Sequence, residues 1–436
     1  MRKREEEFGK VKKLYISMMS LFELADKLFG ATYVAFMRSQ KLSVVQISNL
    51  FSIQQILQAV FDYPTGTISD KIGRKRTAGY GFVVWGVGIL VYAFAVNFWT
   101  FLPAMILMAL GLALISGAPS AWLVDQMILH GVYEERSQIL PKIDTCVRFF
   151  SVAASVASYV LIGVGERMPI LTAGSISILA GVLALSKGED NYGKIQGKNI
   201  VYVLQSQARE FGKDRKLRLL SLRTVFCHVP FVAFVLFWQI YATEIIQIKM
   251  KYLAFLLLIF MLLLMAGNYA VSIVARKMNT LGTSVVGILI SILGFFLLIA
   301  FSSIPSFVIG AGLVEFGFGM EQAATRTWMC DHIKSETRST YSSIFSTVQS
   351  LAGFFIMNLL GLLTEWMGVR TAWIVAAVAM GVDIVILVVF SKKYKEDRNV
   401  GYKQVAIGKY RSSPVKGQKV YYFLMFWSIA EFFSKE

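Results

Sequence analysis

The chain has 436 residues, of which 56% are hydrophobic and 16% are charged, and its formal net charge is +17. Ordinary soluble domains carry roughly 25% charged residues, so this composition excludes a typical soluble protein and favours an integral membrane protein. The excess of Lys and Arg would also fit a nucleic-acid partner, and the positions of these bases decide between the two.

Apolar runs of about 20 residues recur along the chain, and each is long enough to cross roughly 30 Å of hydrocarbon. The sequence therefore predicts an all-α membrane protein. We predict twelve spans, numbered in chain order, at residues 14–36, 44–65, 77–97, 101–125, 142–163, 168–186, 219–243, 252–275, 281–303, 305–330, 341–363 and 371–391. The even number places both termini on one side of the membrane.

The basic residues gather in the N-terminal arm, alternate loops, the central loop and the C-terminal tail. This asymmetry follows the positive-inside rule and predicts that both termini are cytoplasmic. We therefore expect a multi-pass protein of the plasma membrane, with the lipid bilayer as a partner and no nucleic-acid partner. Lys27 and Arg148 are counted as bases inside spans, whereas Arg223 is counted with the central loop.

All three cysteines, Cys146, Cys227 and Cys330, fall inside predicted spans, so the sequence indicates no disulfide framework and no clustered metal site. We expect no cofactor. The basic N-terminus and the apolar run after it resemble a signal peptide, but Glu23 and Asp26 interrupt the run and no small-residue cleavage site follows. We therefore expect span 1 to be retained.

Charge and hydropathy divide the chain into five segments. These are a cytoplasmic arm at 1–13, a six-helix bundle at 14–186, a cytoplasmic linker with an amphipathic helix at 187–218, a second six-helix bundle at 219–391, and a basic and aromatic cytoplasmic tail at 392–436. The apolar stretch 420–433 within the tail is too short to span a membrane. We expect it to lie at the inner interface or against the bundles.

Two sequence patterns recur six spans apart. A W-x-x-D motif ends at Asp125 in span 4 and at Asp331 in span 10, and DYPTGTISDKI (62–72) aligns with NYAVSIVARKM (268–278). Two matches in the same register argue for a duplication. Parallel repeats about an axis along the membrane normal are an architecture used by secondary transporters.

The turn between spans 2 and 3 is a compact charge cluster, GTISDKIGRKRT (66–77). In residue types, spacing and loop position it resembles the signature loop of the major facilitator superfamily. The matching residues are Gly66, Asp70, Gly73, Arg74 and Lys75. With twelve spans and a central basic loop, the resemblance covers about residues 10–391. It implies two pseudo-symmetric six-helix bundles around a central site and transport by alternating access.

The resemblance also implies a latch on the cytoplasmic side. Asp70 would accept hydrogen bonds from the N-terminus of span 11, where the helix dipole favours an anion, and Arg74 would form a two-pronged pair with Asp125. Gly66 would allow close helix approach and Gly73 a tight turn. The latch would join the two halves while the cavity faces outward. In the alternative interpretation, the bases of this loop only set topology against anionic lipid.

Three ionisable residues, Glu23, Asp26 and Lys27, lie near the middle of span 1 on one helical face. A charge at that depth costs at least about 2.5–3.5 kcal/mol on insertion scales and usually faces a cavity or a partner. The order of Glu23 and Lys27 favours an intrahelical pair, which leaves Asp26 over. Asp144 and Arg148 in span 5 predict a similar pair.

Glu315 in span 10 has no oppositely charged neighbour within a helical turn. The resemblance implies that spans 1, 4, 7 and 10 line the cavity, so Glu23, Asp26 and Glu315 would face one water-accessible space. A carboxyl group there could bind a proton or a cationic substrate, but not both, which is a physical basis for proton-coupled exchange. Alternatively, Asp26 pairs with Arg148 or Lys27, and Glu315 accepts hydrogen bonds.

Further polar and aromatic residues are candidates for lining the cavity: Lys27, Arg148, His228, Trp238, Gln239 and Tyr241. The aromatic residues among them suit a hydrophobic or aromatic substrate and suit anchoring at the lipid interface equally well. For His228, a packing role is the alternative. Glu321 is a candidate latch element of the second half, and Asp383 lies in the peripheral span 12.

These features predict a secondary active transporter, most similar to drug/proton antiporters, that exports a small hydrophobic or cationic molecule in exchange for protons or another ion. Span 5 lacks the Gly-Pro pair that drug-exporting antiporters usually carry. The alternatives are uptake or facilitated diffusion of a polar metabolite, or a non-transporting membrane receptor or scaffold. No H-E-x-x-H motif is present, and we expect neither an enzyme nor a metal site. We expect a monomer.

Overall fold

The computed structural model describes residues 2–187, 190, 205, 209, 211–274, 278–332 and 338–393. Within these ranges, side chains are not described for 2–5, 63, 67, 137, 138, 141, 329–332, 338–340, 342, 343 and 393. The predicted tail at 392–436 and most of the predicted linker at 187–218 therefore lie outside the described residues.

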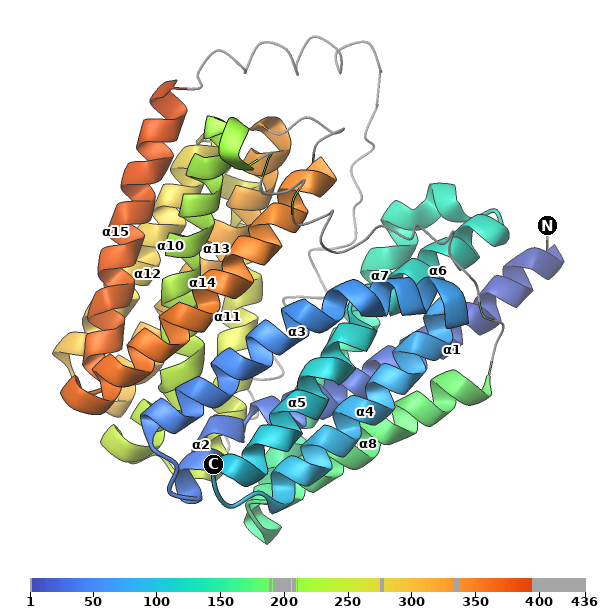
Figure 1. The fold of residues 1–436 in the computed structure, drawn as a ribbon, viewed down its shortest axis with the longest axis horizontal. Helices are drawn as coiled ribbons and strands as arrows, with labels where there is room; N and C mark the ends of the chain where they lie inside the picture. Colours follow the sequence, from blue (N-terminus) through green and yellow to red (C-terminus); the bar gives the residue numbers. More distant parts are fainter. Residues whose placement is uncertain are drawn as a thin grey trace. The chain divides into compact units, whose positions relative to one another are not determined.

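All regular elements in the described ranges are helical, and no strand occurs among them (Figure 1). The first group comprises α1 (Arg2–Gly30), α2 (Tyr33–Ser39), α3 (Val44–Ile72), α4 (Arg74–Phe94), α5 (Phe98–Ile115), α6 (Ala118–Leu129), η1 (Tyr133–Glu135), α7 (Arg136–Val164) and α8 (Met168–Ser186). The second comprises α10 (Arg215–Ile240), η2 (Tyr241–Ile245), η3 (Met250–Tyr252), α11 (Leu253–Val274), α12 (Thr280–Ala300), α13 (Ile304–His332), α14 (Arg338–Met367) and α15 (Val369–Lys393).

Eleven candidate membrane spans occur in the described part of the chain, one fewer than predicted. The missing one is the first: α1 has charged residues in its N-terminal part and again at Glu23, Asp26 and Lys27 near its C-terminal end, so its apolar stretch is too short. The helix nevertheless packs against α7 and α8 within the first group. The predicted span 14–36 is also interrupted, since α1 ends at Gly30 and a short helix, α2, follows.

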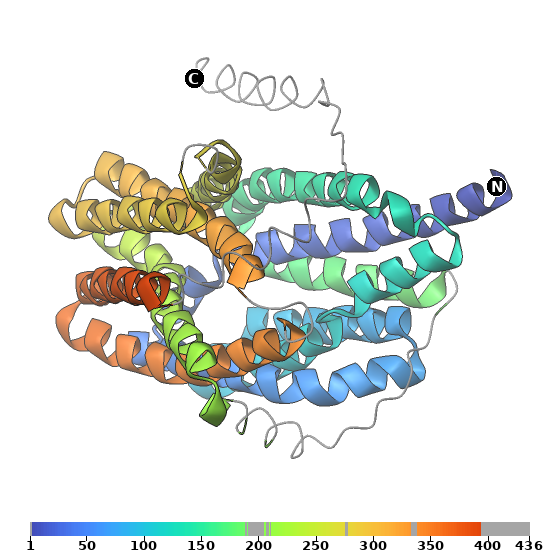
Figure 2. The same ribbon diagram turned by 90° about the horizontal axis from the view of Figure 1, so that it is seen from above.

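The two groups form two helical bundles, which Figure 1 and Figure 2 show from two directions. In the first, α4 packs between α5 and α8, and in the second, α13 packs between α11 and α12. The main contacts between the bundles, among the described residues, are those of α3 with α14, of α7 with α11 and η3, and of α2 with α10. The interface therefore includes α2, α3 and α7 of the first bundle and α10, α11 and α14 of the second.

The predicted span 101–125 is two helices rather than one. Gly117 adopts a left-handed φ of 74° between α5 and α6, and Pro119 lies in the first turn of α6. Proline lacks a backbone donor and is tolerated only in the first turn of an undistorted helix, so α6 begins where the sequence places Pro119. Trp122 on α6 and its repeat counterpart Trp328 on α13 are both buried.

Glycine brings α11 and α13 unusually close together. A Cβ atom on Gly267 would lie 1.9 Å from the carbonyl oxygen of Phe316, and one on Gly319 would lie 2.0 Å from that of Leu264. Each helix thus presents its bare backbone to the other. Small residues have this role in membrane helix pairs, where van der Waals contact drives association.

Candidate functional site

Two turns serve as reference points for the opposite ends of the bundles. The Gly73 side is the end at which α3 meets α4, and the Leu42 side is the opposite end, at which α2 meets α3. The signature motif lies on the Gly73 side. Arg74 forms ion pairs there with two carboxylates, Asp125 of α6 and, at 3.4 Å, Asp70 of α3. The structure thus brings Arg74 and Asp125 together, as expected from the sequence.

Gly73 forms the tight turn, and a residue that the sequence did not single out completes it. The φ angle of Gly73 is 104°, and a Cβ atom there would lie 2.3 Å from the carboxylate of Asp190. Asp190 Oδ1 accepts from the backbone N–H of Lys75 at 2.9 Å, and Oδ2 accepts from that of Arg76 at 3.0 Å. Asp190 therefore caps the positive N-terminal end of α4.

Lys75 turns into the first bundle and does not face the second. Its side chain is buried, and Nζ donates to the carbonyl oxygens of Ala184 at 2.8 Å and Lys187 at 2.7 Å. These carbonyls lie at the C-terminal end of α8, where a cation satisfies orphan acceptors and the helix dipole. Lys75 and Asp190 together fasten α4 to α8.

One expectation for the motif differs from the structure, and one is not tested by it. Gly66 does not sit at a close helix contact, because a Cβ atom there would meet nothing within 4 Å. The close approaches of α3 to α14 occur instead at Gly353 and Gly361, where a Cβ would lie 2.5 Å from Gln55 and from Ser48. The predicted partners of Asp70 at the start of α14 lie outside the described side chains.

On α1, Lys27 pairs with both neighbouring acids. Lys27 Nζ lies 3.9 Å from Glu23 Oε1, which is the expected i, i+4 pair, and 2.6 Å from Asp26 Oδ2, so Asp26 is not left over and the alternative pairing with Lys27 is the one that the structure has. Glu23 also accepts a hydrogen bond of 2.6 Å from the hydroxyl of Ser151 on α7. All three ionisable side chains are partly exposed.

The predicted pair between Asp144 and Arg148 is not formed, since the two side chains make no ion pair within 4.0 Å and both are exposed. The i, i+4 spacing permits such a pair but does not force it, because solvation competes with an exposed ion pair. Arg148 instead lies near enough to Lys27 for the two charges to interact. α1 and α7 thus share one group of charges, made by Glu23, Asp26, Lys27 and Arg148.

Glu315 lies in α13, eleven residues after the helix begins at Ile304, and is half-buried. Its side chain makes no hydrogen bond or ion pair with the described residues. The alternative expectation that it accepts hydrogen bonds is therefore not met in this conformation.

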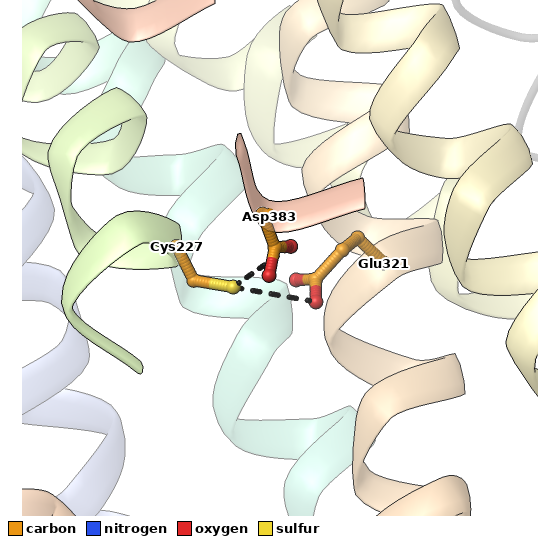
Figure 3. Close-up of side chains that lie close together, drawn as sticks. All are labelled: Cys227, Glu321 and Asp383. Carbon is orange, nitrogen blue, oxygen red and sulfur yellow. Dashed lines mark hydrogen bonds between the residues drawn. The ribbon is translucent and has the colours of Figure 1, made fainter. Parts of the chain in front are cut away.

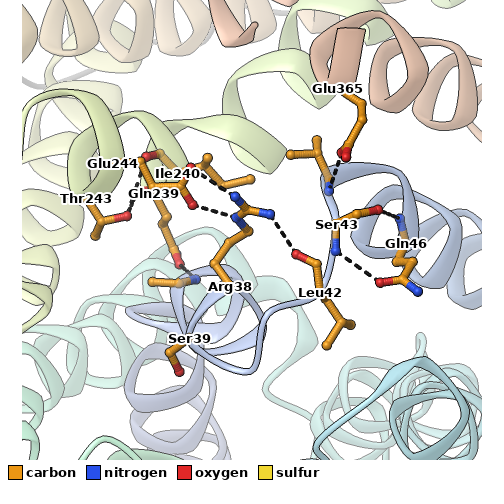
Figure 4. Close-up of polar contacts among 12 residues, drawn as sticks. Arg38, Ser39, Leu42, Ser43, Gln46, Gln239, Ile240, Thr243, Glu244 and Glu365 are labelled. Carbon is orange, nitrogen blue, oxygen red and sulfur yellow. Dashed lines mark hydrogen bonds and ion pairs between the residues drawn. The ribbon is translucent and has the colours of Figure 1, made fainter.

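Gln239 of α10 links the two bundles on the Leu42 side (Figure 4). Its fully buried side chain accepts from the backbone N–H groups of Val34 at 3.1 Å and Ala35 at 3.0 Å, and donates to the carbonyl oxygen of Gly30 at 3.0 Å. One amide thus holds both sides of the break between α1 and α2. The sequence had suggested this residue as a lining of the cavity.

Two carboxylates of the second bundle extend this link, as Figure 4 shows. Glu244, in the π-helical turn η2, forms a two-pronged pair with Arg38, at 2.5 Å to Nε and 3.0 Å to Nη2. Glu365 of α14 accepts from Val44 N at 2.7 Å and Val45 N at 3.3 Å, at the start of α3. We call Gln239, Glu244 and Glu365, with their partners, the Leu42 clamp.

Deeper in the membrane region, His228 of α10 bridges three helices. Its Nε2 lies 3.3 Å from the amide nitrogen of Gln55 on α3, and its Nδ1 lies 3.0 Å from that of Gln349 on α14. The ring is buried, and a neutral imidazole has one donor and one acceptor nitrogen, so one of these two amide nitrogens can donate to it and the other glutamine must present its amide oxygen to the ring N–H. His228 thus joins the two bundles in addition to packing.

Trp238 and Tyr241 pack inside the second bundle and do not line an open space here. Trp238 is buried with its ring 5.3 Å from that of Phe260. Tyr241 is fully buried, its ring lies 4.5 Å from that of Trp373 in a tilted arrangement, and its hydroxyl donates to the carbonyl oxygen of Leu298 at 3.1 Å. Their aromatic surface belongs to the core of the bundle.

A buried group of charges in the second bundle was not predicted. Arg223 of α10 lies 2.5 Å from Glu321 Oε1 of α13 and 3.1 Å from Asp383 Oδ1 of α15. Cys227 Sγ lies 3.2 Å from Asp383 Oδ2 and 4.0 Å from Glu321 Oε1 (Figure 3). Arg223 had been counted with the linker because it lies only eight residues after the start of α10 at Arg215.

Comparison with known proteins identifies the family. The family model of the Major Facilitator Superfamily matches residues 16–357 and, in a second match, 231–434. An uncharacterised transporter of this type from Methanocaldococcus jannaschii is 25% identical over 178 residues, which are 40% of this chain and 44% of that protein. A zebrafish (Danio rerio) protein named "Probable vesicular acetylcholine transporter-A" is 29% identical over 143 residues, 33% of this chain and 27% of that protein. These matches cover less than half of each relative.

Solved structures show the same fold. The nucleoside transporter NupG superposes with a TM-score of 0.71 at 12% identity, covering 88% of this chain and 99% of that one. A bacterial homologue of the human lysosomal transporter Spinster, solved in an inward-facing and unoccupied conformation, gives 0.70 at 15% identity, covering 90% and 98%. The family model matches residues 16–357, most of the chain, and the signature motif lies on the α3–α4 turn, so the chain belongs to the major facilitator superfamily.

Proposed function

We propose that this transporter exports a small hydrophobic or cationic molecule in exchange for protons. The observation that carries this proposal is Glu315, a half-buried carboxyl group on α13 without a hydrogen-bonding or ionic partner among the described residues. An ionisable group within a membrane helix is costly and is typically functional. Glu315 can hold a proton or attract a cation, and the two exclude each other.

The charged group on α1 supplies the second element of the proposed site. Glu23 and Asp26 are partly exposed and share Lys27 as a counter-charge, so a proton or a cationic substrate can compete for either carboxylate. Zebrafish relatives with 29% and 27% identity are named as vesicular acetylcholine transporters, and acetylcholine is a cation. Their names support a cationic substrate here.

We further propose that the Gly73 side is cytoplasmic, with both termini on that side, in the plasma membrane. The basic loops support this orientation. The Leu42 clamp would then be the outer gate, and Asp70, Arg74 and Asp125 would act as the cytoplasmic latch when that gate opens. The proposed bundles are residues 14–186 and 219–391, and a monomer would suffice for transport.

A second candidate is transport of a polar metabolite. The fold neighbours include a nucleoside transporter, and the paired charges on α1 could hold a zwitterionic or polar solute. The two candidates differ in whether a pH gradient drives flux of a lipophilic cation.

The test is flux of tetraphenylphosphonium into proteoliposomes under an imposed pH gradient. We expect gradient-driven flux in the wild type and at least a tenfold loss in Glu315→Gln, because the amide can neither carry a proton nor attract a cation. Asp26→Asn should weaken the flux less, since Glu23 remains beside Lys27.

Glu134→Gln is the matched control, because this carboxylate is almost fully exposed in the η1 turn. Its flux should equal that of the wild type. Wild-type flux in both Glu315→Gln and Asp26→Asn would contradict the assigned acids. No cation flux in the wild type would favour the polar-metabolite candidate, for which nucleosides are the first solutes to test.

A further inference from the structure

The buried charges around Arg223 are the strongest feature that the proposed substrate site does not use. Side-chain exposure is 2% for Arg223, 3% for Asp383 and 14% for Glu321. Three helices, α10, α13 and α15, each contribute one of these residues. Burial of an unbalanced charge at such a position costs several kcal/mol, so the protonation of the group matters to the fold.

The balance of charge can be counted from the side chains that face this group. α10 contributes Arg223 and the thiol of Cys227, α13 contributes Glu321, and α15 contributes Asp383. The other neighbours are uncharged: Thr325 donates to Glu321 Oε1 at 2.6 Å, Ser284 of α12 contacts Thr325, and the ring of Trp328 lies under the guanidinium. Among the described residues, one cation thus faces two carboxyl groups.

Hydrogen bonding distinguishes the two carboxyl groups. Glu321 Oε1 accepts from both Arg223 and Thr325, as an ionised carboxylate does. Asp383 Oδ1 has no hydrogen bond of good geometry, although it lies 3.1 Å from Arg223 Nε, and Cys227 donates to its other oxygen. A fully buried carboxyl oxygen without a donor is costly when ionised, and less so when it bears a proton.

A metal ion is a poorer occupant than a proton. The potential ligand atoms of Cys227, Glu321 and Asp383 lie within 4.8 Å of one another (Figure 3). However, Arg223 already contacts both carboxyl groups, and a metal ion would have to sit beside its fixed positive charge. A proton adds to the same oxygens without displacing the guanidinium.

We propose that this group, which we call the Arg223 proton site, binds one proton shared between Glu321 and Asp383. With the proton bound, the site is neutral and can remain dry. Without it, the site carries one net negative charge and needs water or movement of a helix. Glu321 is the most exposed of the three, so it is the point at which the proton enters and leaves.

Proton binding at this site can reach the Leu42 clamp through a single helix. α10 carries Arg223 and Cys227, then His228, which contacts Gln55 of the first bundle, and three turns later Gln239 of the clamp. A shift of α10 upon loss of the proton would therefore strain both contacts between the bundles. As a coupling site it would deepen the proposed proton-coupled function, whereas binding of the proton is independent of any substrate.

The test uses pH-difference infrared spectra of the full-length protein in lipid nanodiscs, without substrate. In the wild type we expect a protonated-carboxyl band that titrates. Asp383→Asn and Glu321→Gln should each abolish the contribution of this site, because one remaining carboxylate against Arg223 is a neutral pair with no proton to lose. Either variant alone suffices if the other does not fold.

Glu315→Gln is the matched control, since it removes a single acid from α13 outside the site. It should remove only the contribution of its own carboxyl group and keep the part of the band that Asp383→Asn abolishes, even if it loses cation flux, so the two proposals fail separately. Arg223→Gln should increase the band, because two carboxyl groups without a cation both remain protonated. Spectra of Asp383→Asn and Glu321→Gln identical to the wild type would overturn the proposal.

Discussion

Lys75 lies two residues after the positive-φ glycine of the signature turn, and its ammonium group donates to two carbonyl oxygens at the end of α8. A buried lysine in this setting acts as a C-terminal cap for another helix. Its neighbour Arg76 is mostly exposed and lies 3.8 Å from Asp190. Two adjacent basic residues of one motif therefore differ in what they contribute to stability.

We expect Lys75→Met to destabilise the protein by about 1–3 kcal/mol, because it leaves buried carbonyl groups without a donor. Thermal unfolding of the purified protein in detergent measures the effect. Arg76→Met is the control and should change the midpoint little, since exposed ion pairs contribute at most about 1 kcal/mol. Equal midpoints for the two variants would show that the contacts of Lys75 do not stabilise the fold.

For single residues, the sequence indicated which acidic and basic side chains matter more reliably than it indicated which side chains they contact. The pair between Arg74 and Asp125 followed from the motif. The capping role of Asp190 and the burial of Arg223 did not, because each depends on where a second helix lies. Spacing along one helix says which side chains can meet, and tertiary packing decides which of them do.

In the second bundle, α11 and α13 approach each other most closely where each helix carries a glycine, at Gly267 and Gly319. Gly312, also on α13, differs from Gly319: a Cβ atom there would meet only the end of the Leu263 side chain, at 2.7 Å. A leucine side chain can rotate away, whereas a backbone carbonyl in a packed helix cannot.

We expect Gly319→Ala to force α11 and α13 apart and to cost about 1–3 kcal/mol, the usual range for overpacking. Gly312→Ala should be tolerated within about 0.5 kcal/mol. Thermal unfolding in detergent measures both. If Gly312→Ala proves as harmful as Gly319→Ala, the backbone contact with Leu264 is not the limiting one.

Hydropathy predicted the positions of the helices well, because runs of about 20 apolar residues have few other uses. It failed where local chemistry interrupts a span. The break between α5 and α6 could have been predicted from Gly117 and Pro119, which together favour a helix start. The end of α1 at Gly30 could not be predicted. The backbone N–H and C=O groups that this break leaves unpaired are bound by the side chain of Gln239, more than 200 residues later.

At the scale of the whole molecule, the contacts of the Leu42 clamp and the bridge at His228 hold the two bundles together on one side and near the middle. Alternating access requires that such contacts break in the opposite state. The clamp should therefore set the balance between the two states, and a single residue with three hydrogen bonds should have a measurable share in it.

We expect Gln239→Ala to favour opening of the Leu42 side, because three hydrogen bonds at roughly 0.5–1.5 kcal/mol each are lost. Spin labels at Ser39→Cys and Lys249→Cys, in a background without native cysteines, report the distance by pulsed electron paramagnetic resonance. The distribution should shift to longer values than in the parent.

Gln46→Ala is the control, since in the part of the chain that the structure describes the Gln46 side chain bonds only to Ser43, just before its own helix. It should leave the distances unchanged. An unchanged distribution in Gln239→Ala would mean that Glu244 and Glu365 suffice to hold the side closed.

The clamp residues of the second bundle contact two kinds of group in the first bundle: Gln239 and Glu365 bind backbone groups, and Glu244 binds a side chain. Gln239 and Glu365 bind backbone groups of the first bundle, at Gly30, Val34, Ala35, Val44 and Val45, so the chemical identity of those five positions is not read by the contact. Side-chain changes at these five positions should therefore leave the five hydrogen bonds in place, whereas replacement of Gln239 or Glu365 removes them. Arg38 differs, because its own side chain pairs with Glu244.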